Sequence, residues 1–554
     1  MPFLRSLCLK QFRTFKDETR FDFAPLTIIT GPNSSGKSSV LKALLLLQES
    51  IRRRGMETAK MDGFAHTLGR LEFGDYTHGL QDFKAAHART ASDDHLKISL
   101  GIENALGSYL PAVLDREVTE FDERFVKVLA LDRLGEEFSW PSPIELDMVF
   151  RFGTLNHVSL HDASKSNRKK IAEVIDHVKF DVDEERLAEQ GHVYLPTYEH
   201  CILNGAWFRD QIGSDYETFC ENLQAHPTDR LFALWEHLGH AGWADVGPSG
   251  IDSLYKTAPY TLTDRFESGD PSLISDEATD DDLMQRLLIK QFAEFTVRPL
   301  LRQAVENFLS VLRKMQFHQF LPLDSKSIYI KEEGGLGADL RANFSETEQR
   351  TIRYWMEAFG IGSGLKVSEG TKGVFTVDVI RDGEEIPLRY IGSGHRRLLA
   401  FLLNVGTGGG RHEGPLLIEE PEANLHPNLQ STLADVFVSI CEETEPRFGP
   451  GSHLGSGPEL PGAADRPHFM PNHQLIVETH SEYLIRRLQY LVATNAAKPE
   501  DIVIYYLGPD PEAEDYVKRI TIASSGKLSE SFGPGFTDES TNLMIDLYKQ
   551  THQN

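Results

Sequence analysis

The chain has 554 residues, 40% of them hydrophobic and 25% charged, which is enough for roughly two or three domains with buried cores. Its 83 acidic and 57 basic residues give a net charge of −26. This charge argues against a protein that coats DNA passively, because such proteins carry a basic balance or stripe. The four cysteines have no metal-ligand spacing, and we find neither a signal peptide nor the roughly 20 consecutive apolar residues that span a bilayer. These features predict a cytoplasmic protein without disulfides, a zinc site or a membrane partner.

The first informative segment is the β-branched run 26–30, which leads into a glycine-rich turn and then into the helix-forming run 40–47. A buried parallel strand followed by such a turn lets backbone N–H groups surround phosphates, and the positive end of the next helix faces them. Lys37 would reach the β- and γ-phosphates of a nucleotide, and the Ser38 hydroxyl would bind Mg²⁺. The residues predicted to contact the nucleotide are Gly31, Asn33, Ser34, Ser35, Gly36, Lys37, Ser38 and Ser39.

The next part of the chain has the patterns of a strand-rich lobe and then of an insertion. Residues 96–100, 125–129 and 144–150 alternate with a period of two, which is typical of antiparallel strands. Between 165 and 365 no apolar heptads continue over the roughly three or four repeats that indicate a coiled coil. The longest helical pattern there is 283–317, so this part is predicted to be a compact helical domain.

A second apolar run, 416–418, ends in two carboxylates, Glu419 and Glu420, and Pro421 stops the strand at once. Ligands of open α/β sheets lie at the carboxyl ends of the strands, so both side chains are expected to face the phosphates. Glu419 would hold Mg²⁺, and Glu420 would orient and deprotonate the attacking water. An exposed acidic loop would also follow an apolar strand, so this pair gains its meaning from the phosphate loop.

Two further segments place small or titratable residues at the ends of elements. In the segment 390–397, Ser393 and Gly394 precede an apolar helical run, and small residues at a helix N-terminus allow a phosphate to approach closely. The run 475–478 is another buried strand, and His480 follows it where a sensor of the γ-phosphate is expected. A histidine at a strand end is also commonly a purely structural residue.

In this order, the phosphate loop, the Gly-Ser-Gly signature, the acidic strand with Pro-Glu-Ala-Asn-Leu-His and the Thr-His-Ser turn resemble the head of ABC-type ATPases, in the soluble SMC-like and OLD-like branch. The resemblance covers about residues 1–50 and 385–525. It implies an α/β fold, with a mixed sheet that carries the phosphate loop and an antiparallel β lobe, and ATP with Mg²⁺ as cofactors. It also implies a head-to-head dimer or higher oligomer. In that dimer Ser393 and Gly394 of one subunit would face the nucleotide held by Lys37, Ser38, Glu419, Glu420 and His480 of the other.

The sequence departs from the family pattern at two places. Glu419 stands where family members often have Asp, and the usual Gly-Gly-Gln ending of the signature reads Gly394-His395-Arg396. Residues 424–426 match the loop that crosses between the two sites of the dimer. Gln48 and Gln81 are both candidates for the glutamine loop of this family.

These patterns divide the chain into an N-terminal half of the head (1–164), an inserted helical domain (165–365) and a C-terminal half of the head (366–554). Too few residues follow His480 for the metal-binding toprim domain of OLD-family nucleases, and no His-Asn-His nuclease pattern occurs. The C-terminal residues 535–548 resemble those of stand-alone ATPases of prokaryotic anti-phage systems, the Septu-type and retron-associated subunits. That resemblance implies ATP-dependent dimerisation that controls a separate nuclease or toxin effector, with DNA or retron nucleic acid as a further partner.

Three other functions remain open from the sequence. The first is a DNA-binding repair ATPase of the RecF or SMC kind, which clamps duplex ends. The second is a nucleotide switch that binds but does not hydrolyse. The third, a transporter head, fits least, because the stretch between the phosphate loop and the signature far exceeds what that role uses.

Overall fold

The computed structural model describes a large part of the chain, and the statements below refer to that part. The described residues are 4–57, 69–75, 78–88, 94–103, 142–164, 168–174, 192–195, 201–204, 206, 304–305, 307–319, 328–330, 346–369, 374–406, 414–441, 474–533, 536 and 539–552.

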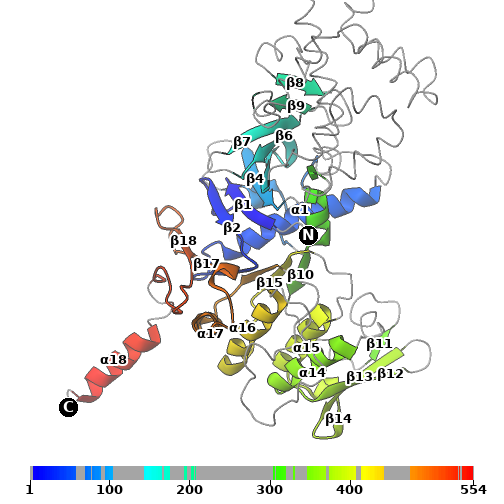
Figure 1. Ribbon diagram of the computed structural model, residues 1–554, viewed down its shortest axis with the longest axis vertical. Helices are drawn as coiled ribbons and strands as arrows, with labels where there is room; N and C mark the ends of the chain where they lie inside the picture. Colours follow the sequence, from blue (N-terminus) through cyan, green and yellow to red (C-terminus); the bar gives the residue numbers. More distant parts are fainter. Residues whose placement is uncertain are drawn as a thin grey trace, which may run out of the picture.

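A largely parallel sheet of six strands forms the centre of the molecule (Figure 1). Its order is β10 (Gln316–Gln319), β15 (Leu416–Glu419), β16 (Leu475–Glu478), β3 (Leu26–Thr30), β17 (Ile502–Leu507) and β18 (Val517–Ile520). The strands are parallel except β18, which runs antiparallel to β17. The strand before the phosphate loop, β3, therefore lies between two strands from the C-terminal part of the chain.

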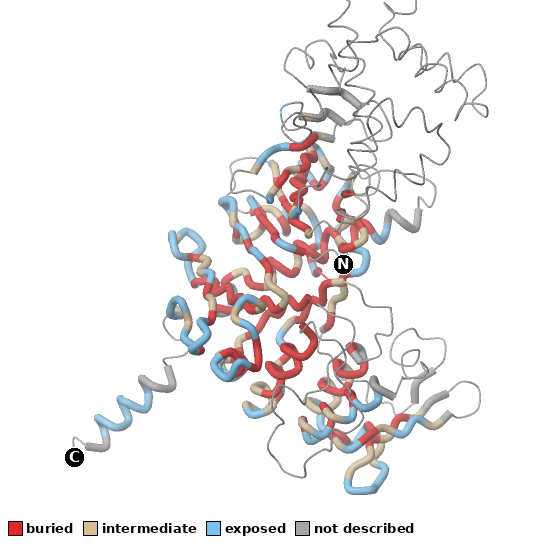
Figure 2. The backbone as a smooth tube through the Cα atoms, in the orientation of Figure 1, coloured by how far each residue is buried: buried red, intermediate tan, exposed pale blue. Residues whose placement is uncertain are grey.

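Side chains of these strands alternate between two cores, as the period of a β-strand requires. In β3, Ile29 belongs to a core that includes α1 (Lys37–Glu57) and the antiparallel lobe. Leu26 and Ile28 belong to a second core on the other face. Figure 2 shows buried residues concentrated along this sheet and its covering helices. The helices of the second core are α14 (Glu346–Ala358), α15 (Ser393–Gly406), α16 (Pro427–Cys441) and α17 (Glu482–Ala493).

Two antiparallel sheets flank the central sheet. The larger has the order β2 (Thr19–Asp22), β1 (Leu4–Lys10), β4 (His95–Ile102), β5 (Ile144–Arg151), β6 (Thr154–Asp162), β7 (Lys169–Val174), β9 (Cys201–Asn204) and β8 (His192–Leu195). The smaller contains β11 (Ile328–Ile330), β13 (Val374–Arg381), β12 (Gly364–Glu369) and β14 (Glu384–Pro387). Shorter or peripheral elements are α3 (Phe83–Ala86), η4 (Leu388–Tyr390), η6 (Pro499–Asp501) and α18 (Glu539–His552).

This arrangement confirms the predicted fold class, a mixed sheet that carries the phosphate loop together with an antiparallel β lobe. The patterns at 96–100 and 144–150 are the strands β4 and β5. The pattern at 125–129 lies outside the described residues, as does most of 283–317; within the latter, residues 307–314 are helical and β10 begins at Gln316.

The range 165–365 needs a correction, because its described residues are not all helical. The strands β7, β9 and β8 continue the large antiparallel sheet, so this sheet crosses the predicted boundary at 164/165. Each of these strands has only four to six residues, too short for a clear alternation in the sequence. The strand β12 likewise runs across the predicted boundary at 365/366. The helical character of the residues of this range that lie outside the described ones stays a prediction.

The last helix, α18, contains residues 543–548, which the sequence predicts to be amphipathic; Leu543, Met544, Ile545, Leu547 and Tyr548 are exposed. Figure 2 colours this part of the helix as exposed. Among the helices in the described ranges, none combines the length and apolar character that a bilayer crossing requires.

Candidate active site

The phosphate loop has a backbone that only glycine adopts easily at two positions. Gly31 has φ +143° and Gly36 has φ +89°. A Cβ atom on Gly31 would lie 2.2 Å from the Leu507 carbonyl oxygen, and one on Gly36 would lie 2.2 Å from Thr14 Oγ1. Ser34, with φ +64°, supplies a third left-handed residue. The loop is therefore a tight turn with little side-chain bulk, as a phosphate cradle requires.

The loop ends at the start of α1, which carries no acidic residue in its first turn. The first N–H groups of a helix lack intrahelical partners, so the start of α1 can accept an anion without competition from a carboxylate of its own. Lys37 is 4% exposed, and its Nζ donates to the Pro32 carbonyl oxygen at 2.7 Å. Burial lowers the pKa of Lys37, and nearby carboxylates, Glu478 foremost, oppose this shift. Ser35 Oγ is buried without a hydrogen-bond partner.

The structure brings the acidic strand to the same edge. Glu419 is the last residue of β15, and Glu420 follows with φ +43°, while its backbone N–H donates to the Glu478 carbonyl oxygen at 2.9 Å. Burial raises the pKa of Glu419, Glu420 raises it further, and Lys42 opposes them. The Glu420 side chain is 53% exposed, so its carboxylate is open to solvent at the edge of the sheet.

His480 lies beside Glu420. The two side chains approach to 3.8 Å between His480 Nε2 and Glu420 Oε1. Burial lowers the pKa of His480, and Lys37 lowers it further, while Glu420 opposes them. The imidazole is therefore neutral near pH 7, with one ring nitrogen that donates and one that accepts.

Glu478 also lies at this edge, although the sequence patterns gave it no role. It ends β16, lies in register with Glu419 and is 2% exposed. Ser38 Oγ donates to Glu478 Oε1 at 2.8 Å, and Glu478 Oε2 is buried without a hydrogen-bond partner. Burial raises the pKa of Glu478 to about 7, which Glu419 favours and the Ser38 hydrogen bond and Lys37 oppose. Its shared position with Glu419, last in a buried strand, is the sequence signal that would have indicated it.

A second carboxylate without an assigned role, Glu422, holds the turn that carries His480. Glu422 Oε1 accepts from the His480 backbone N–H at 2.6 Å, and Glu422 Oε2 accepts from Thr479 Oγ1 at 2.8 Å. Ser481 Oγ donates to Gln430 Oε1 at 2.7 Å, and Gln430 Nε2 donates to the Leu425 carbonyl oxygen at 3.0 Å. The loop after the acidic strand and the His480 turn are therefore one hydrogen-bonded unit.

The signature residues lie at the start of α15, next to that same loop. Ser393 is exposed, and a Cβ on Gly394 would lie 2.9 Å from the Asn424 carbonyl oxygen. Arg397 Nη1 donates to the Ala423 carbonyl oxygen at 3.2 Å. Only a very small residue at 394 allows this contact. The role of Ser393 and Gly394 across a dimer stays a prediction.

Neither candidate for the glutamine loop lies at the phosphate loop. Gln48 Nε2 donates to the carbonyl oxygens of Met315 and Leu312, the latter at 3.1 Å. Its position on α1 is eleven residues after Lys37, which is roughly 16 Å along the helix axis at about 1.5 Å per residue. Gln81 is exposed next to Asp82, which caps the short helix α3.

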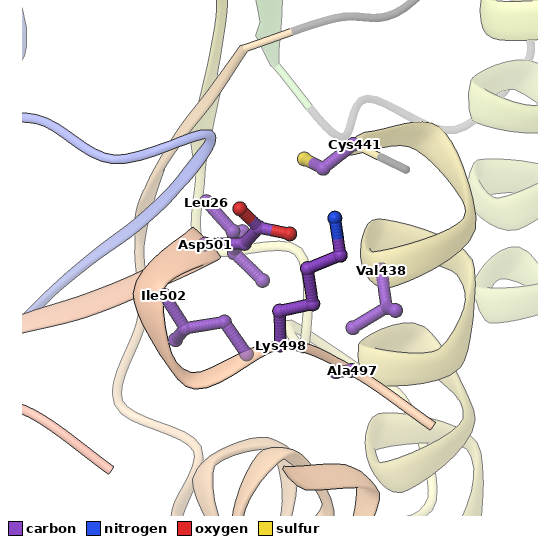
Figure 3. Close-up of a pocket in the computed structure, with 7 residues that line it drawn as sticks. All are labelled: Leu26, Val438, Cys441, Ala497, Lys498, Asp501 and Ile502. Carbon is purple, nitrogen blue, oxygen red and sulfur yellow. The ribbon is translucent and has the colours of Figure 1, made fainter. Parts of the chain in front are cut away.

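A small pocket elsewhere on the sheet is a separate feature (Figure 3). Leu26, Val438, Cys441, Ala497, Lys498, Asp501 and Ile502 line it. Leu26 and Ile502 begin their strands, whereas the phosphate loop follows the end of β3. The pocket therefore lies at the opposite edge of the sheet from the candidate site.

The residues at the site fit a magnesium nucleotide. The cradle of glycines, the start of α1 and Lys37 suit phosphates, and the orphaned Glu478 Oε2 suits a cation. Within the described ranges, no three His, Cys, Asp or Glu side chains gather into a complete metal cluster. Such a site suits Mg²⁺, which keeps several waters and substrate phosphates in its shell.

Comparison with known families agrees with this geometry. The family model described as "AAA ATPase domain" matches residues 3–128 and 269–485, which is more than half of the chain. The chain belongs to the AAA ATPase domain family. This family membership assigns ATPase chemistry in general to the chain, with ATP as the nucleotide and Mg²⁺ as its usual companion ion.

Individual proteins match the chain only over a short segment or at low sequence identity. A 75-residue segment is 39% identical to the chromosome partition protein Smc of Mycobacterium leprae (strain TN), covering 13% of this chain and only 6% of that relative. One solved structure is an Smc head domain from Pyrococcus furiosus, which has an extended coiled coil and is bound to the C-terminal domain of ScpA. It is 11% identical to this chain at a TM-score of 0.35, and the match covers 99% of this chain and 100% of the head-domain chain. The SMC head domain from Thermotoga maritima is 9% identical at a TM-score of 0.32, covering 94% and 99%.

Proposed function

We propose that this chain is a soluble, SMC-like ABC-type ATPase that hydrolyses ATP and, as a dimer or higher oligomer, controls a separate nuclease or toxin effector of an anti-phage system. One observation carries the ATPase part. The ends of three adjacent parallel strands, β15, β16 and β3, collect three carboxylates (Glu419, Glu420 and Glu478), a histidine and the phosphate loop at one edge. The effector and the anti-phage role rest on the resemblance of the C-terminal residues.

In the proposed reaction the phosphate loop and Lys37 hold the β- and γ-phosphates. Lys37 Nζ now donates to a loop carbonyl, so it would exchange this bond for a phosphate oxygen. Mg²⁺ held by Ser38 and Glu419 would neutralise charge on the transferred phosphoryl group. Glu420, half exposed at the strand end, would orient the attacking water and take its proton.

His480 would complete this arrangement from the next strand. Its neutral imidazole lies 3.8 Å from Glu420 and can donate a hydrogen bond to the γ-phosphate or to the attacking water. Ser393 and Gly394 would close the site from the partner subunit, with no large side chain to obstruct the phosphate. ATP binding would thus lock two heads together, and hydrolysis would release them.

The test separates the chemistry from the biological role. Steady-state phosphate release with ATP and Mg²⁺ measures hydrolysis, and Glu420→Gln is expected to abolish turnover while retaining nucleotide. If the wild-type chain binds ATP but releases no phosphate, it is a nucleotide switch. For the role, tagged Glu420→Gln protein is captured from its native host with ATP and Mg²⁺, and bound protein and nucleic acid are identified. A stoichiometric nuclease or toxin supports effector control, and its absence contradicts it.

A second candidate function is a DNA-binding ATPase of the SMC or RecF kind. The segment that is 39% identical to a chromosome partition protein favours it. The capture experiment would then return DNA without a protein partner. Purified protein would also bind duplex DNA with an affinity that falls steeply with salt, since phosphate contacts release counterions.

A further inference from the structure

We propose that Glu478 is a ligand of the magnesium site, so that the metal is held by β16 through Glu478 and by the Ser38 hydroxyl as well as by Glu419 on β15. This inference rests on the ATPase function proposed above and adds a residue to its metal site. Three observations support it: the position of Glu478 in the sheet, its distance from Ser38, and the state of its second oxygen.

The position follows from the strand register. Glu478 pairs with Glu419 on one side and with Ile29 of β3 on the other. The strand β16 therefore lies between the acidic strand and the strand that leads into the phosphate loop. A carboxylate at its carboxyl end faces the same edge as the phosphate cradle. Glu478 is thus the central carboxylate of this edge.

The distance between the two oxygens is compatible with a shared metal. Ser38 Oγ and Glu478 Oε1 are 2.8 Å apart. Magnesium demands near-octahedral geometry with metal–oxygen distances of about 2.0–2.1 Å, which places neighbouring ligands about 2.9 Å apart. The hydrogen bond therefore holds the two oxygens at the spacing of adjacent magnesium ligands. Binding the ion would require a new direction for the hydroxyl proton and little movement of either oxygen.

The second oxygen of Glu478 indicates that the hydrogen bond with Ser38 does not satisfy the group. Glu478 is 2% exposed, and its Oε2 has no hydrogen-bond partner. Burying a carboxylate in this way is costly unless a cation or several donors compensate it. The nearest lysine of the loop, Lys37, donates to the Pro32 carbonyl oxygen. A divalent cation at this edge would supply the missing compensation, with phosphate oxygens and water completing its shell.

Glu422 provides an instructive contrast on the neighbouring loop. It is also a largely buried carboxylate, but both of its oxygens accept hydrogen bonds, from the His480 N–H and from Thr479 Oγ1. Its hydrogen bonding is thus accounted for by protein donors alone. Of the two, Glu478 is the group left with a free acceptor at the metal edge.

The experiment measures metal binding directly, without turnover. Mn²⁺ replaces Mg²⁺, and electron paramagnetic resonance counts free Mn²⁺ during titration of the full chain with a non-hydrolysable ATP analogue. Glu478→Gln keeps the shape and an acceptor oxygen but removes the charge, so we expect Mn²⁺ affinity to fall by about tenfold or more, the range seen when metal-site partners are lost. Affinity for the analogue in EDTA should stay within about twofold of wild type. Wild-type Mn²⁺ affinity in this variant would overturn the proposal.

Two further variants separate ligation from mere orientation of Ser38. If Glu478 only orients the hydroxyl, Glu478→Gln will cause no additional loss of Mn²⁺ affinity in a Ser38→Ala background. A metal ligand will lose affinity again in that background. Glu478→Asp, which keeps the charge but shortens the side chain, should bind Mn²⁺ more weakly than wild type and more tightly than Glu478→Gln. If Glu478→Gln does not fold, Glu478→Asp decides, and Mn²⁺ affinity equal to wild type then overturns the proposal.

The matched control is Glu49→Gln, which removes another buried carboxylate, one that lies on α1 itself and pairs with Arg53 at 2.9 Å. It should leave Mn²⁺ affinity unchanged, because residue 49 is three turns along α1 from Ser38. Failure of the two proposals is distinguishable. If the wild-type chain shows no nucleotide-dependent Mn²⁺ binding, the ATPase proposal itself fails. If it binds and Glu478→Gln binds equally well, only the role of Glu478 fails.

Discussion

The turn that carries His480 depends on one buried carboxylate, and Glu422→Gln tests that dependence. Glu422 accepts from the His480 backbone N–H at 2.6 Å and from Thr479 Oγ1 at 2.8 Å. Glutamine keeps a single acceptor oxygen, so its NH₂ group replaces the acceptor of one of these two bonds. If it faces Thr479 Oγ1, it competes with the Ser481 N–H, which already donates to that oxygen at 3.0 Å, and if it faces the His480 N–H, two donors oppose each other in a buried site. We therefore expect the His480 turn to shift while the phosphate loop remains intact.

The magnitude follows from the hydrogen bond that is lost. A hydrogen bond to a charged group contributes about 1.5–3 kcal/mol, and about 1.4 kcal/mol corresponds to a tenfold change in rate. If this energy positions His480 for the reaction, kcat should fall by about 10- to 150-fold. Nucleotide affinity should change less than kcat, since the hydrogen bonds of Glu422 go to the turn that carries His480 and its effect on Lys37 is electrostatic. Steady-state phosphate release and a separate nucleotide-binding titration measure the two effects.

The control variant is Glu482→Gln on the same turn. Glu482 pairs with Arg486 at 3.1 Å on the surface of α17, so its loss should leave kcat unchanged. Glu422→Gln should also add little to His480→Ala, because both act through the same side chain. A Glu422→Gln enzyme with kcat within about twofold of wild type would refute the positioning role, since the lost bond predicts at least about tenfold. A full additional loss in the His480→Ala background would refute the route through His480.

Three other predictions follow from residues of the same sheet. Glu420→Gln should lower single-turnover hydrolysis by about 100-fold or more, the usual contribution of a general base, with ATP affinity preserved; hydrolysis near the wild-type rate would exclude Glu420 as the base. Gln474→Leu should lower the free energy of unfolding by about 2 to 4 kcal/mol in urea titrations, because it leaves the Leu4 backbone N–H and C=O without the bonds of 3.0 and 2.7 Å that Gln474 makes. Burial raises the pKa of Glu478 from its usual value of 4.5 to about 7. This carboxyl therefore lowers the free energy of unfolding of the metal-free protein as the pH rises from 4.5 to about 7. Glu478→Gln should therefore raise the melting temperature in EDTA at pH 8 and much less at pH 5, and an equal change at both would contradict that pKa.

The parts of the site that can be predicted from the sequence are those whose functional residues directly follow a strand in the sequence. The phosphate loop, the Glu419–Glu420 pair and His480 each follow a short apolar run, and a run of this kind identifies a strand end from local sequence. The rule that ligands lie at the carboxyl ends of parallel strands then brings them together. The structure places all three on adjacent strands.

Glu478 and Glu422 had no assigned role because their meaning depends on distant partners. Glu478 is the last residue of a fully buried strand, and its partner Ser38 is 440 positions away. Glu422 binds a turn 58 positions later. Periodicity reports burial but not which distant donor a carboxylate will meet. The short strands β7, β8 and β9 were missed for a related reason, since their pairing partners decide their structure more than their own four to six residues do.

The position of β3 between β16 and β17 affects how the protein folds during its synthesis. Residues 26–30 leave the ribosome long before the two strands that pair with them, β16 and β17, which comprise residues 475–478 and 502–507. At about 5–20 residues per second, translation takes roughly half a minute to a minute and a half to deliver those partners. During that time the nucleotide-binding sheet cannot close around its central strand. A chain truncated before residue 475 would carry the whole phosphate-loop motif and still lack the neighbouring strands β16 and β17, so activity begins only after residues 475–507 have been made.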